Sequence, residues 1–123
     1  MSFWNQLQKP FFVVAPMADV TDAPFRRMIA KYSAHERADG TVGGPDVMWT
    51  EFVAADGLMR ATPEGKRKLM ADLIYEEEER PIVAQLFSSN EAYMEQAAKL
   101  AADLGFDGID LNLSLIHISE PTR

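Results

Sequence analysis

The stretch that most constrains this chain is FFVVAPMADVTDAPF, at residues 11–25. It begins as an apolar run, breaks at Ala15, Pro16 and Met17, and restarts after Thr21 and Asp22, either of which can cap a helix. A buried strand that ends in a polar turn and leads into a helix is the repeating unit of α/β proteins. Ligands bind at the carboxyl ends of the strands in such folds, so a site is first expected at this turn.

Three more apolar segments repeat this unit along the chain. They lie at residues 46–50, 81–87 and 108–113, and segments with helix caps or helical spacing separate them. With the first strand at residues 11–15, the order is strand, helix, strand, helix, strand, helix, strand. This order is typical of parallel strands joined by helical crossovers.

Two architectures have this order: a (β/α)₈ barrel and an open doubly wound sheet. No G-x-G-x-x-G motif follows the first strand, and Pro16 and Met17 occupy that turn instead, which favours the barrel. A complete barrel needs about 250 residues, and the 123 residues here are roughly half of that. We therefore predict an α/β fold, the N-terminal half of a (β/α)₈ TIM barrel with four parallel strands and helical crossovers. The first and fourth strands would be open edges.

Composition narrows the classes of function. Lysine and arginine total 12 against 19 aspartates and glutamates, a net charge of −7, so the chain lacks the basic footprint of a nucleic-acid-binding surface. The absence of cysteine excludes disulfides, thiolate zinc sites and a cysteine nucleophile within these residues. No apolar run approaches the roughly 20 residues of a membrane span, and the N-terminus does not resemble a secretory signal. We expect a cytoplasmic protein without a membrane segment or a metal.

Charged side chains are expected at the surface. The apolar stripe of the first helix would turn Arg26 and Arg27 toward solvent. The four glutamates at residues 76–79 are interpreted as a solvated turn, not as metal ligands. Ser88 and Glu91 have the spacing of a capping box for the helix before the fourth strand.

Polar residues inside apolar strands are the candidates for a site. Gln85 lies in the third strand, Asp110 and Asn112 lie in the fourth, and Glu51 follows the second. A buried amide such as that of Gln85 either satisfies a group of the core or points at a ligand. Since Glu51, Gln85 and Asn112 all fall near carboxyl ends of predicted strands, the barrel rule places them near the site.

The pattern fails after Asn112. Residues 113–123, LSLIHISEPTR, offer no glycine turn, helix cap or amphipathic helix, and they are similar to the translation of a transposon-type sequencing adapter. We therefore expect residues 1–113 to form a partial TIM-barrel domain that is truncated near Asn112, and residues 114–123 to be a non-native tail. His117, which lies in this tail, is given no catalytic role.

The chain resembles the tRNA-dihydrouridine synthase family. The pattern A-P-M-x-x-V-T-D-x-x-F-R at residues 15–26 is quite specific to that family, and A-Q-L-F at 84–87 and D-L-N at 110–112 add weaker support. The resemblance implies an FMN-binding (β/α)₈ barrel followed by a small helical domain. It also implies that NADPH reduces the FMN, which passes a hydride to C6 of a uridine in tRNA while an acid protonates C5.

The resemblance also implies roles for individual residues. Ala15, Pro16 and Met17 would line the flavin ring, largely through their backbone, and Gln85 would hydrogen-bond the pyrimidine edge of the isoalloxazine. These are the expected cofactor-binding residues. The expected substrate-binding residues are Asn112, beside the flavin and the flipped uracil, and Glu51, facing the pocket.

One departure from the family pattern bears on catalysis. The family's fourth strand continues into Gly-Cys-Pro, whose cysteine is the proton donor, whereas Leu113 and Ser114 stand there in this chain. No catalytic residue is therefore assigned, and this fragment is expected to be inactive, with the parent's tRNA-binding surface mostly absent. Two alternatives stay open: another FMN barrel, such as a dihydroorotate dehydrogenase-like enzyme, and a non-catalytic half-barrel that acts as an interaction module.

Overall fold

A computed structural model of the chain describes residues 2–113. The expected tail at residues 114–123, with Ser114 and His117, lies outside the described residues. The elements, in chain order, are η1 (Phe3–Gln6), β1 (Val13–Val14), α1 (Ala23–Tyr32), β2 (His35–Glu36), β3 (Val42–Gly43), β4 (Val47–Ala54), α2 (Ala55–Arg60), α3 (Pro63–Ala71), η2 (Glu77–Glu79), β5 (Ile82–Phe87), α4 (Glu91–Asp103) and β6 (Gly108–Leu111).

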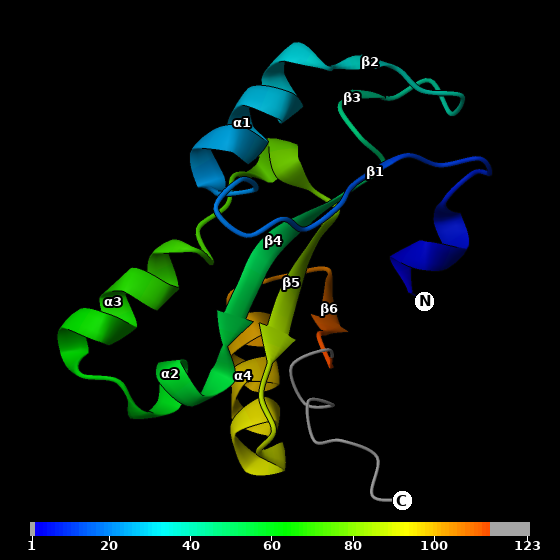
Figure 1. Ribbon diagram of the computed structural model, residues 1–123. Helices are drawn as coiled ribbons and strands as arrows, with labels where there is room; N and C mark the ends of the chain where they lie inside the picture. Colours follow the sequence, from blue (N-terminus) through cyan, green and yellow to red (C-terminus); the bar gives the residue numbers. More distant parts are fainter. Residues whose placement is uncertain (1, 114–123) are drawn as a thin grey trace, which may run out of the picture.

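The main sheet has four strands in the order β1-β4-β5-β6, and every neighbouring pair is parallel. Helices connect β1 to β4, β4 to β5 and β5 to β6 (Figure 1). The prediction of an α/β fold with four parallel strands and helical crossovers, as in half of a (β/α)₈ barrel, is confirmed. The strands predicted to be open edges, β1 and β6, lie at the two ends of the sheet.

Helices cover one face of this sheet. Val53, Ala84 and Leu86 of the strands pack with Leu58 of α2 and Ala97 of α4 in the larger core cluster. Each of these side chains is at most 1% exposed, and burying a valine or leucine side chain stabilises the fold by about 1.5–3 kcal/mol. Side chains of β5 alternate between faces, so Val83, Gln85 and Phe87 lie on the opposite face, which we call the inner face.

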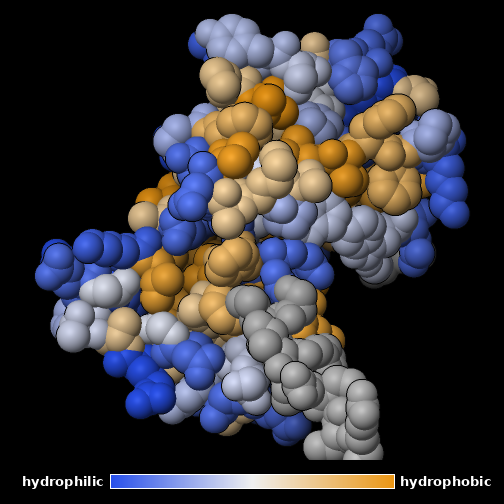
Figure 2. All heavy atoms as spheres, in the orientation of Figure 1, coloured by the Kyte–Doolittle hydropathy of each residue, from blue (hydrophilic) through white to orange (hydrophobic). Residues whose placement is uncertain are grey.

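The edges of the sheet leave apolar side chains at the surface. Phe12 is 73% exposed and Val13 42% at the β1 edge, and Ile109 is 46% exposed and Leu111 48% at the β6 edge. Figure 2 shows hydrophobic side chains in a band across the middle of the molecule. An edge strand with exposed apolar side chains is a template for pairing with another strand.

Several element boundaries differ from the predicted ones. β4 continues to Ala54. Its pairing with β5 shifts register between Trp49 and Phe52, so the polar residues Thr50 and Glu51 lie inside the strand. Glu51 therefore lies within the strand and not after it. The segment expected to be a plain loop, at residues 34–45, contains the antiparallel pair β2–β3.

Of the two caps predicted above, the one left open between Thr21 and Asp22 is formed by Asp22, and the capping box of Ser88 and Glu91 is wrong. Asp22 caps α1, since its Oδ1 accepts a hydrogen bond from the Phe25 N–H at 2.9 Å. The cap of α4 is Asn90, whose Oδ1 accepts from the Tyr93 N–H at 3.1 Å. Ser88 precedes the helix and donates to the carboxylate of Asp56 instead.

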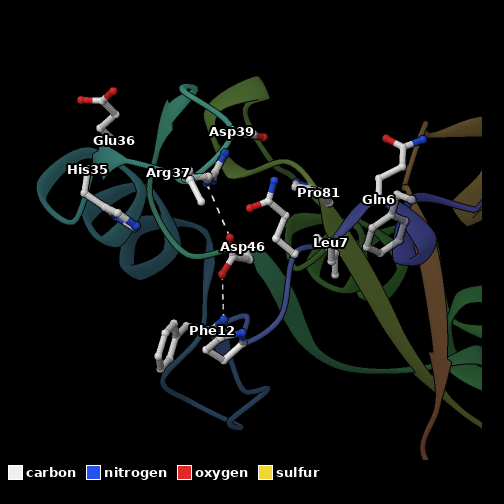
Figure 3. Close-up of a pocket in the computed structure, with 13 residues that line it drawn as sticks. Gln6, Leu7, Phe12, His35, Glu36, Arg37, Asp39, Asp46 and Pro81 are labelled. Carbon is white, nitrogen blue, oxygen red and sulfur yellow. Dashed lines mark hydrogen bonds and ion pairs between the residues drawn. The ribbon is translucent and has the colours of Figure 1, made fainter.

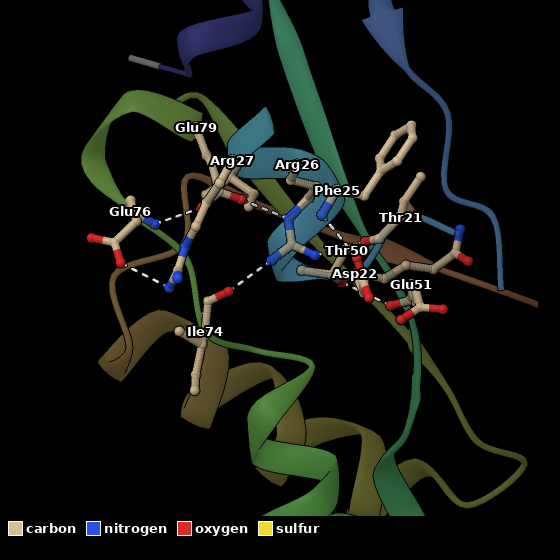
Figure 4. A network of polar contacts seen from close by, with 12 residues as sticks. Thr21, Asp22, Phe25, Arg26, Arg27, Thr50, Glu51, Ile74, Glu76 and Glu79 are labelled. Carbon is tan, nitrogen blue, oxygen red and sulfur yellow. Dashed lines mark hydrogen bonds and ion pairs between the residues drawn. The ribbon is translucent and has the colours of Figure 1, made fainter. Parts of the chain in front are cut away.

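The prediction for the charged residues is wrong at two positions. Arg26 is fully buried, and Glu79, the last of the four glutamates, is 1% exposed. The Nε of Arg26 donates to Glu79 Oε1 at 2.7 Å, forming an ion pair between α1 and η2 (Figure 4). Arg27, in contrast, is exposed as predicted. A buried charge requires a partner of opposite sign, and the partner here is distant in sequence.

Candidate functional site

The amino-terminal end of the inner face is closed by aromatic side chains. Trp4 of η1 packs on Trp49 of β4, with ring centroids 5.8 Å apart. Phe3 lies so close to β6 that a Cβ added at Gly108 would be 3.4 Å from its ring. The N-terminal segment therefore covers this end of the strands, and ligand contacts on the inner face are left to the carboxyl end.

At the carboxyl end of the inner face, three polar side chains form a connected row. Gln85 and Asp110 are register partners on β5 and β6. The Nε2 of Gln85 donates to Asp110 Oδ2 at 2.7 Å, and the Nδ2 of Asn112 donates to Gln85 Oε1 at 3.4 Å. Gln85 is 8% exposed. We call Gln85, Asp110 and Asn112 the amide row.

The backbone beneath the amide row is held by neighbouring strands. The Gln85 N–H donates to the hydroxyl of Thr50 at 3.1 Å, and the Asn112 N–H donates to the Leu86 carbonyl at 2.9 Å. Thr50 is fully buried at the irregularity of β4, so its hydroxyl replaces a backbone acceptor for β5. The irregularity thus helps to fix the backbone of Gln85, through the hydroxyl of Thr50.

An aromatic pair flanks the row. Phe52 is the register partner of Gln85, and its ring meets that of Phe87 edge to face, with centroids 5.2 Å apart. Phe52 is 38% exposed. Apolar rings beside a few fixed polar groups are the usual lining of a site for a planar heterocycle.

The turn after β1, with Ala15, Pro16 and Met17, lies at the carboxyl end of the neighbouring strand β1. Strand β4 separates β1 from β5, so the turn and Gln85 are about two strand spacings, roughly 10 Å, apart across the sheet. The Met17 side chain is 46% exposed. Its backbone is already engaged, because the Met17 N–H donates to the Thr21 hydroxyl at 3.0 Å and the Met17 carbonyl accepts from the Thr21 N–H at 3.0 Å.

Glu51 belongs to the β1 side and not to the amide row. Its Oε1 accepts a hydrogen bond from the backbone N–H of Asp19, in the turn after β1. Burial raises the pKa of Glu51, the hydrogen bond from Asp19 opposes this, and the charges of Asp72, Asp22 and Asp19 raise it further. The structure thus brings Gln85 and Asn112 into contact, and it places Glu51 against the turn that holds Met17.

Sequence reasoning missed two residues of this arrangement. Asp110 was noted as polar but was not chosen, although it stands two residues before Asn112 and so shares its face. Thr50 gave no signal, because a threonine in a strand is ordinary. The alternation of polar residues along β6 was the signal that could have identified Asp110.

Neither of two prominent hollows among the described residues includes a predicted site residue. The first has a volume of about 320 Å³ and lies at the amino-terminal end of the strands, between the N-terminal segment and the β2–β3 pair (Figure 3). There Arg37 donates to the carbonyls of Gly44 and Pro45, and Asp46 accepts from the Phe12 N–H at 2.7 Å. Parts of Arg37 and Asp46 are thus engaged within the chain, but the buried Nε of Arg37 has no hydrogen-bond partner among the described residues and lies 3.8 Å from Asp46 Oδ1. We take the carboxyl end as the candidate site because ligands of parallel α/β folds bind there.

The second hollow, of about 430 Å³, lies between α1 and the glutamates of residues 76–79. It is lined by charges of both signs, including the exposed pair Arg27–Glu76 with 2.8 Å between Nη2 and Oε1. Within residues 2–113, no group of three or more histidine, cysteine, aspartate or glutamate residues is arranged to hold a metal ion. No helix in that range is long and apolar enough to cross a membrane.

Comparison with known proteins places this arrangement in a family. The family model for dihydrouridine synthase matches residues 13–114. The chain is 36% identical over 112 residues to "Probable tRNA-dihydrouridine synthase 2" of Bacillus subtilis, covering 91% of this chain and 31% of that protein. It is 34% identical over 112 residues to "Probable tRNA-dihydrouridine synthase" of Staphylococcus aureus strain COL, covering 91% of this chain and 30% of that protein.

The chain belongs to the dihydrouridine synthase family, a family of oxidoreductases built on a TIM barrel. It spans less than a third of the length of these curated relatives.

Proposed function

We propose that this chain is the flavin-binding part of an enzyme that reduces uridine to 5,6-dihydrouridine in tRNA, with FMN as cofactor and NADPH as reductant. The observation that supports this proposal is the amide row at the carboxyl end of a parallel sheet in a dihydrouridine synthase chain. The same membership favours tRNA over the free pyrimidine acid of a dihydroorotate dehydrogenase-like enzyme, and catalysis over a purely structural module.

The donors and acceptors of the row fit the edge of a flavin. The amide of Gln85 has two N–H groups and two lone pairs, of which Asp110 and Asn112 take one each. One N–H and one lone pair remain, and this donor–acceptor pair complements the pyrimidine edge of an isoalloxazine. FMN, when bound, supplies the hydride chemistry, and the protein supplies binding and orientation.

The residues of this chain would bind and orient the ligand. Asp110 fixes which end of the Gln85 amide is donor and which is acceptor, because a carboxylate accepts only from the nitrogen. Ala15, Pro16 and Met17 would border the ring from the β1 side, and the pair Phe52–Phe87 would keep water from the apolar part of the site. Asn112 would face the uracil, with Glu51 contributing at the β1 side of the pocket.

We further propose that the printed chain does not complete the reaction by itself. It contains no cysteine and therefore no counterpart of the family's proton donor. Its net charge of −7 does not favour phosphate contacts, so the tRNA backbone would be held elsewhere in the protein. Removing a uridine from its stack costs a few kcal/mol, which such contacts must offset.

Flavin binding by the purified chain tests the proposal. We expect addition of the chain to quench FMN fluorescence in a saturable way, and we expect the variant Gln85→Leu to remove that saturation. Gln8→Leu, at an exposed position near the opposite end of the strands, is the matched control and should bind like the parent chain. Equal FMN binding by the parent chain and Gln85→Leu would show that the amide row is not the flavin site.

A further inference from the structure

The turn after β1 is fixed from beneath by a buried arginine. The guanidinium of Arg26 makes three contacts of 2.7 Å: Nη1 to the Thr21 carbonyl, Nη2 to the Ile74 carbonyl and Nε to Glu79 Oε1 (Figure 4). Both partners of the ion pair have fully buried side chains. Arg26 thus joins the turn after β1, the segment after α3, and η2.

Glu79 is itself held in place. Its second oxygen, Oε2, accepts the backbone N–H of Glu76 at 2.7 Å, which completes a reciprocal cap of the short helix η2. Its orientation is therefore set by the backbone of η2, and Arg26 is oriented by Glu79. The chain of contacts runs from η2 through α1 to Thr21.

Thr21 transmits this position to Met17. It is fully buried, and its hydroxyl accepts from the Met17 N–H at 3.0 Å and lies 3.2 Å from the Met17 carbonyl, to which it donates. Between them, Asp19 has a backbone φ of 60°, a left-handed conformation that few residues other than glycine adopt. The Asp19 N–H is held by the carboxylate of Glu51 on β4. The turn of residues 17–21 is therefore tied to β4 and to α1.

Stability does not explain why a charged pair occupies this position. Replacing a buried ion pair by apolar residues of similar volume is often neutral or stabilising. Arginine offers instead a rigid, planar fork of donors that fixes several acceptors at once, which a methionine or a lysine cannot do. What the pair uniquely provides here is a fixed distance between η2 and the carbonyl of Thr21.

We propose that Arg26, oriented by Glu79, is a positioning residue for the cofactor site: it fixes the turn of residues 17–21 in its ligand-binding conformation. This inference rests on the proposed function for its ligand, but its structural part concerns the free chain. Its effect on a ligand would be transmitted through Thr21 and Met17, since both of Arg26's other contacts face away from the turn, toward Ile74 and Glu79.

Hydrogen exchange in the free chain tests the structural part. In Arg26→Lys, we expect the amides of Met17, Val20 and Thr21, all hydrogen-bonded within the turn, to exchange about tenfold faster relative to the amides of β5. Leu58→Ala, a core substitution in α2 on the helix-covered face, is the control for lost global stability and should not change that ratio. Equal ratios in the two variants would overturn the proposal.

Glu79→Gln provides a second variant if Arg26→Lys does not fold. It keeps an acceptor for the Nε of Arg26 but removes the charge, and we expect a smaller rise in exchange at the same three amides. No rise in the turn relative to Leu58→Ala would again overturn the proposal.

FMN titration of the same variants separates this inference from the proposed function. We expect Arg26→Lys to weaken FMN binding about tenfold and Leu58→Ala to leave it unchanged. One outcome is that neither the parent chain nor any variant binds FMN while hydrogen exchange in the turn changes as expected. In that case the proposed function is wrong, and the positioning of the turn by Arg26 stands. If FMN binds equally well to the parent chain and Arg26→Lys, the positioning role is wrong while the function stands.

Discussion

Two of the polar networks among the described residues differ in whether a ligand could reach their remaining hydrogen-bonding groups. In the network of Arg26, Glu79 and Thr21, each charged group is fully buried and meets its partners inside the chain. In the amide row, Gln85 keeps one donor and one acceptor after its contacts with Asp110 and Asn112. Both networks interrupt apolar elements, and Arg26 keeps two of its five N–H donors after its three contacts. Only the row lies at the carboxyl end of the strands, where a ligand could reach its remaining groups.

The difference shows that a polar residue in an apolar element has two distinct explanations. A closed network fixes the relation between segments, and its loss should cost folding free energy. A network whose remaining donors and acceptors face a ligand site should cost little folding free energy when disrupted but should lose its ligand. Position separates the two: Arg26 is 0% exposed beneath the turn after β1, whereas Gln85 is 8% exposed on the inner face, at the carboxyl end of the strands.

The largest expected effect on stability is that of Arg26→Met. Removal of one partner leaves Glu79 as an unpaired buried charge, and breaking a buried pair in this way typically costs about 3–5 kcal/mol. The urea midpoint of the purified chain, followed by far-ultraviolet circular dichroism, measures this loss. The double variant Arg26→Met with Glu79→Met should recover a large part of it, because no charge is left unpaired.

A double variant as unstable as Arg26→Met alone would contradict this account. It would show that the hydrogen bonds of Arg26 to the Thr21 and Ile74 carbonyls, and not the ion pair, carry the stability. Hydrogen bonds, and not opposite charges, would then hold both networks together.

The second expected effect is a smaller change in stability, at a residue whose substitution is expected to act mainly on ligand binding. Gln85→Leu, the variant expected to lose FMN, should change the free energy of unfolding by at most about 1.5 kcal/mol, because the volume is nearly kept and Asp110 is only partly buried. The same urea experiment measures it. A loss as large as that of Arg26→Met would mean that the amide row is a structural network, closed like the other.

A third prediction concerns Glu51, which lies at the border between the two networks. Burial raises its pKa above the ordinary 4.5, so the folded chain holds this proton more tightly than the unfolded chain does. Protonated Glu51 therefore makes its whole contribution to the free energy of unfolding below pH 4.5. That contribution is lost as the pH rises through the raised pKa of the folded state. Glu51→Gln should therefore flatten the decline of stability over this range and be more stable than the parent chain at pH 7.

Urea unfolding at several pH values measures this slope. Asp72, whose pKa is also raised by burial, should leave a residual decline of the same sign in Glu51→Gln. An unchanged slope in that variant would place the titrating group elsewhere.

The fold could be predicted from the sequence to the extent that each strand is a continuous apolar run. Buried parallel strands are apolar on both faces, so β5 was found nearly at its observed position. β6 was also found nearly at its observed position, although Asp110 interrupts it and its apolar side chains are half exposed. β4 was cut short because Thr50 and Glu51 look like the end of a strand, whereas the irregularity of register keeps them inside it. The β2–β3 pair was missed because its residues show no apolar alternation.

The residues of the candidate site could be predicted only where a polar residue stands out against an apolar background. Gln85 and Asn112 were chosen on that basis and are in contact. Arg26 was assigned to solvent because helical periodicity considers one helix at a time, and its partner Glu79 is 53 residues away. No local pattern could separate Arg26 from Arg27, or Glu79 from the three glutamates before it.

The smallest expected effect is therefore that of Arg27→Met, which provides the matched control for Arg26→Met. Arg27 pairs with Glu76 at 2.8 Å, but the two side chains are 46% and 54% exposed. Water and salt screen such a pair, which usually contributes about 0–1 kcal/mol, so the urea midpoint should change little and should change less in 1 M salt. A loss that approaches that of Arg26→Met would show that the whole face of α1 against η2 is cooperative, and the contrast between a buried and an exposed arginine at adjacent positions would fail.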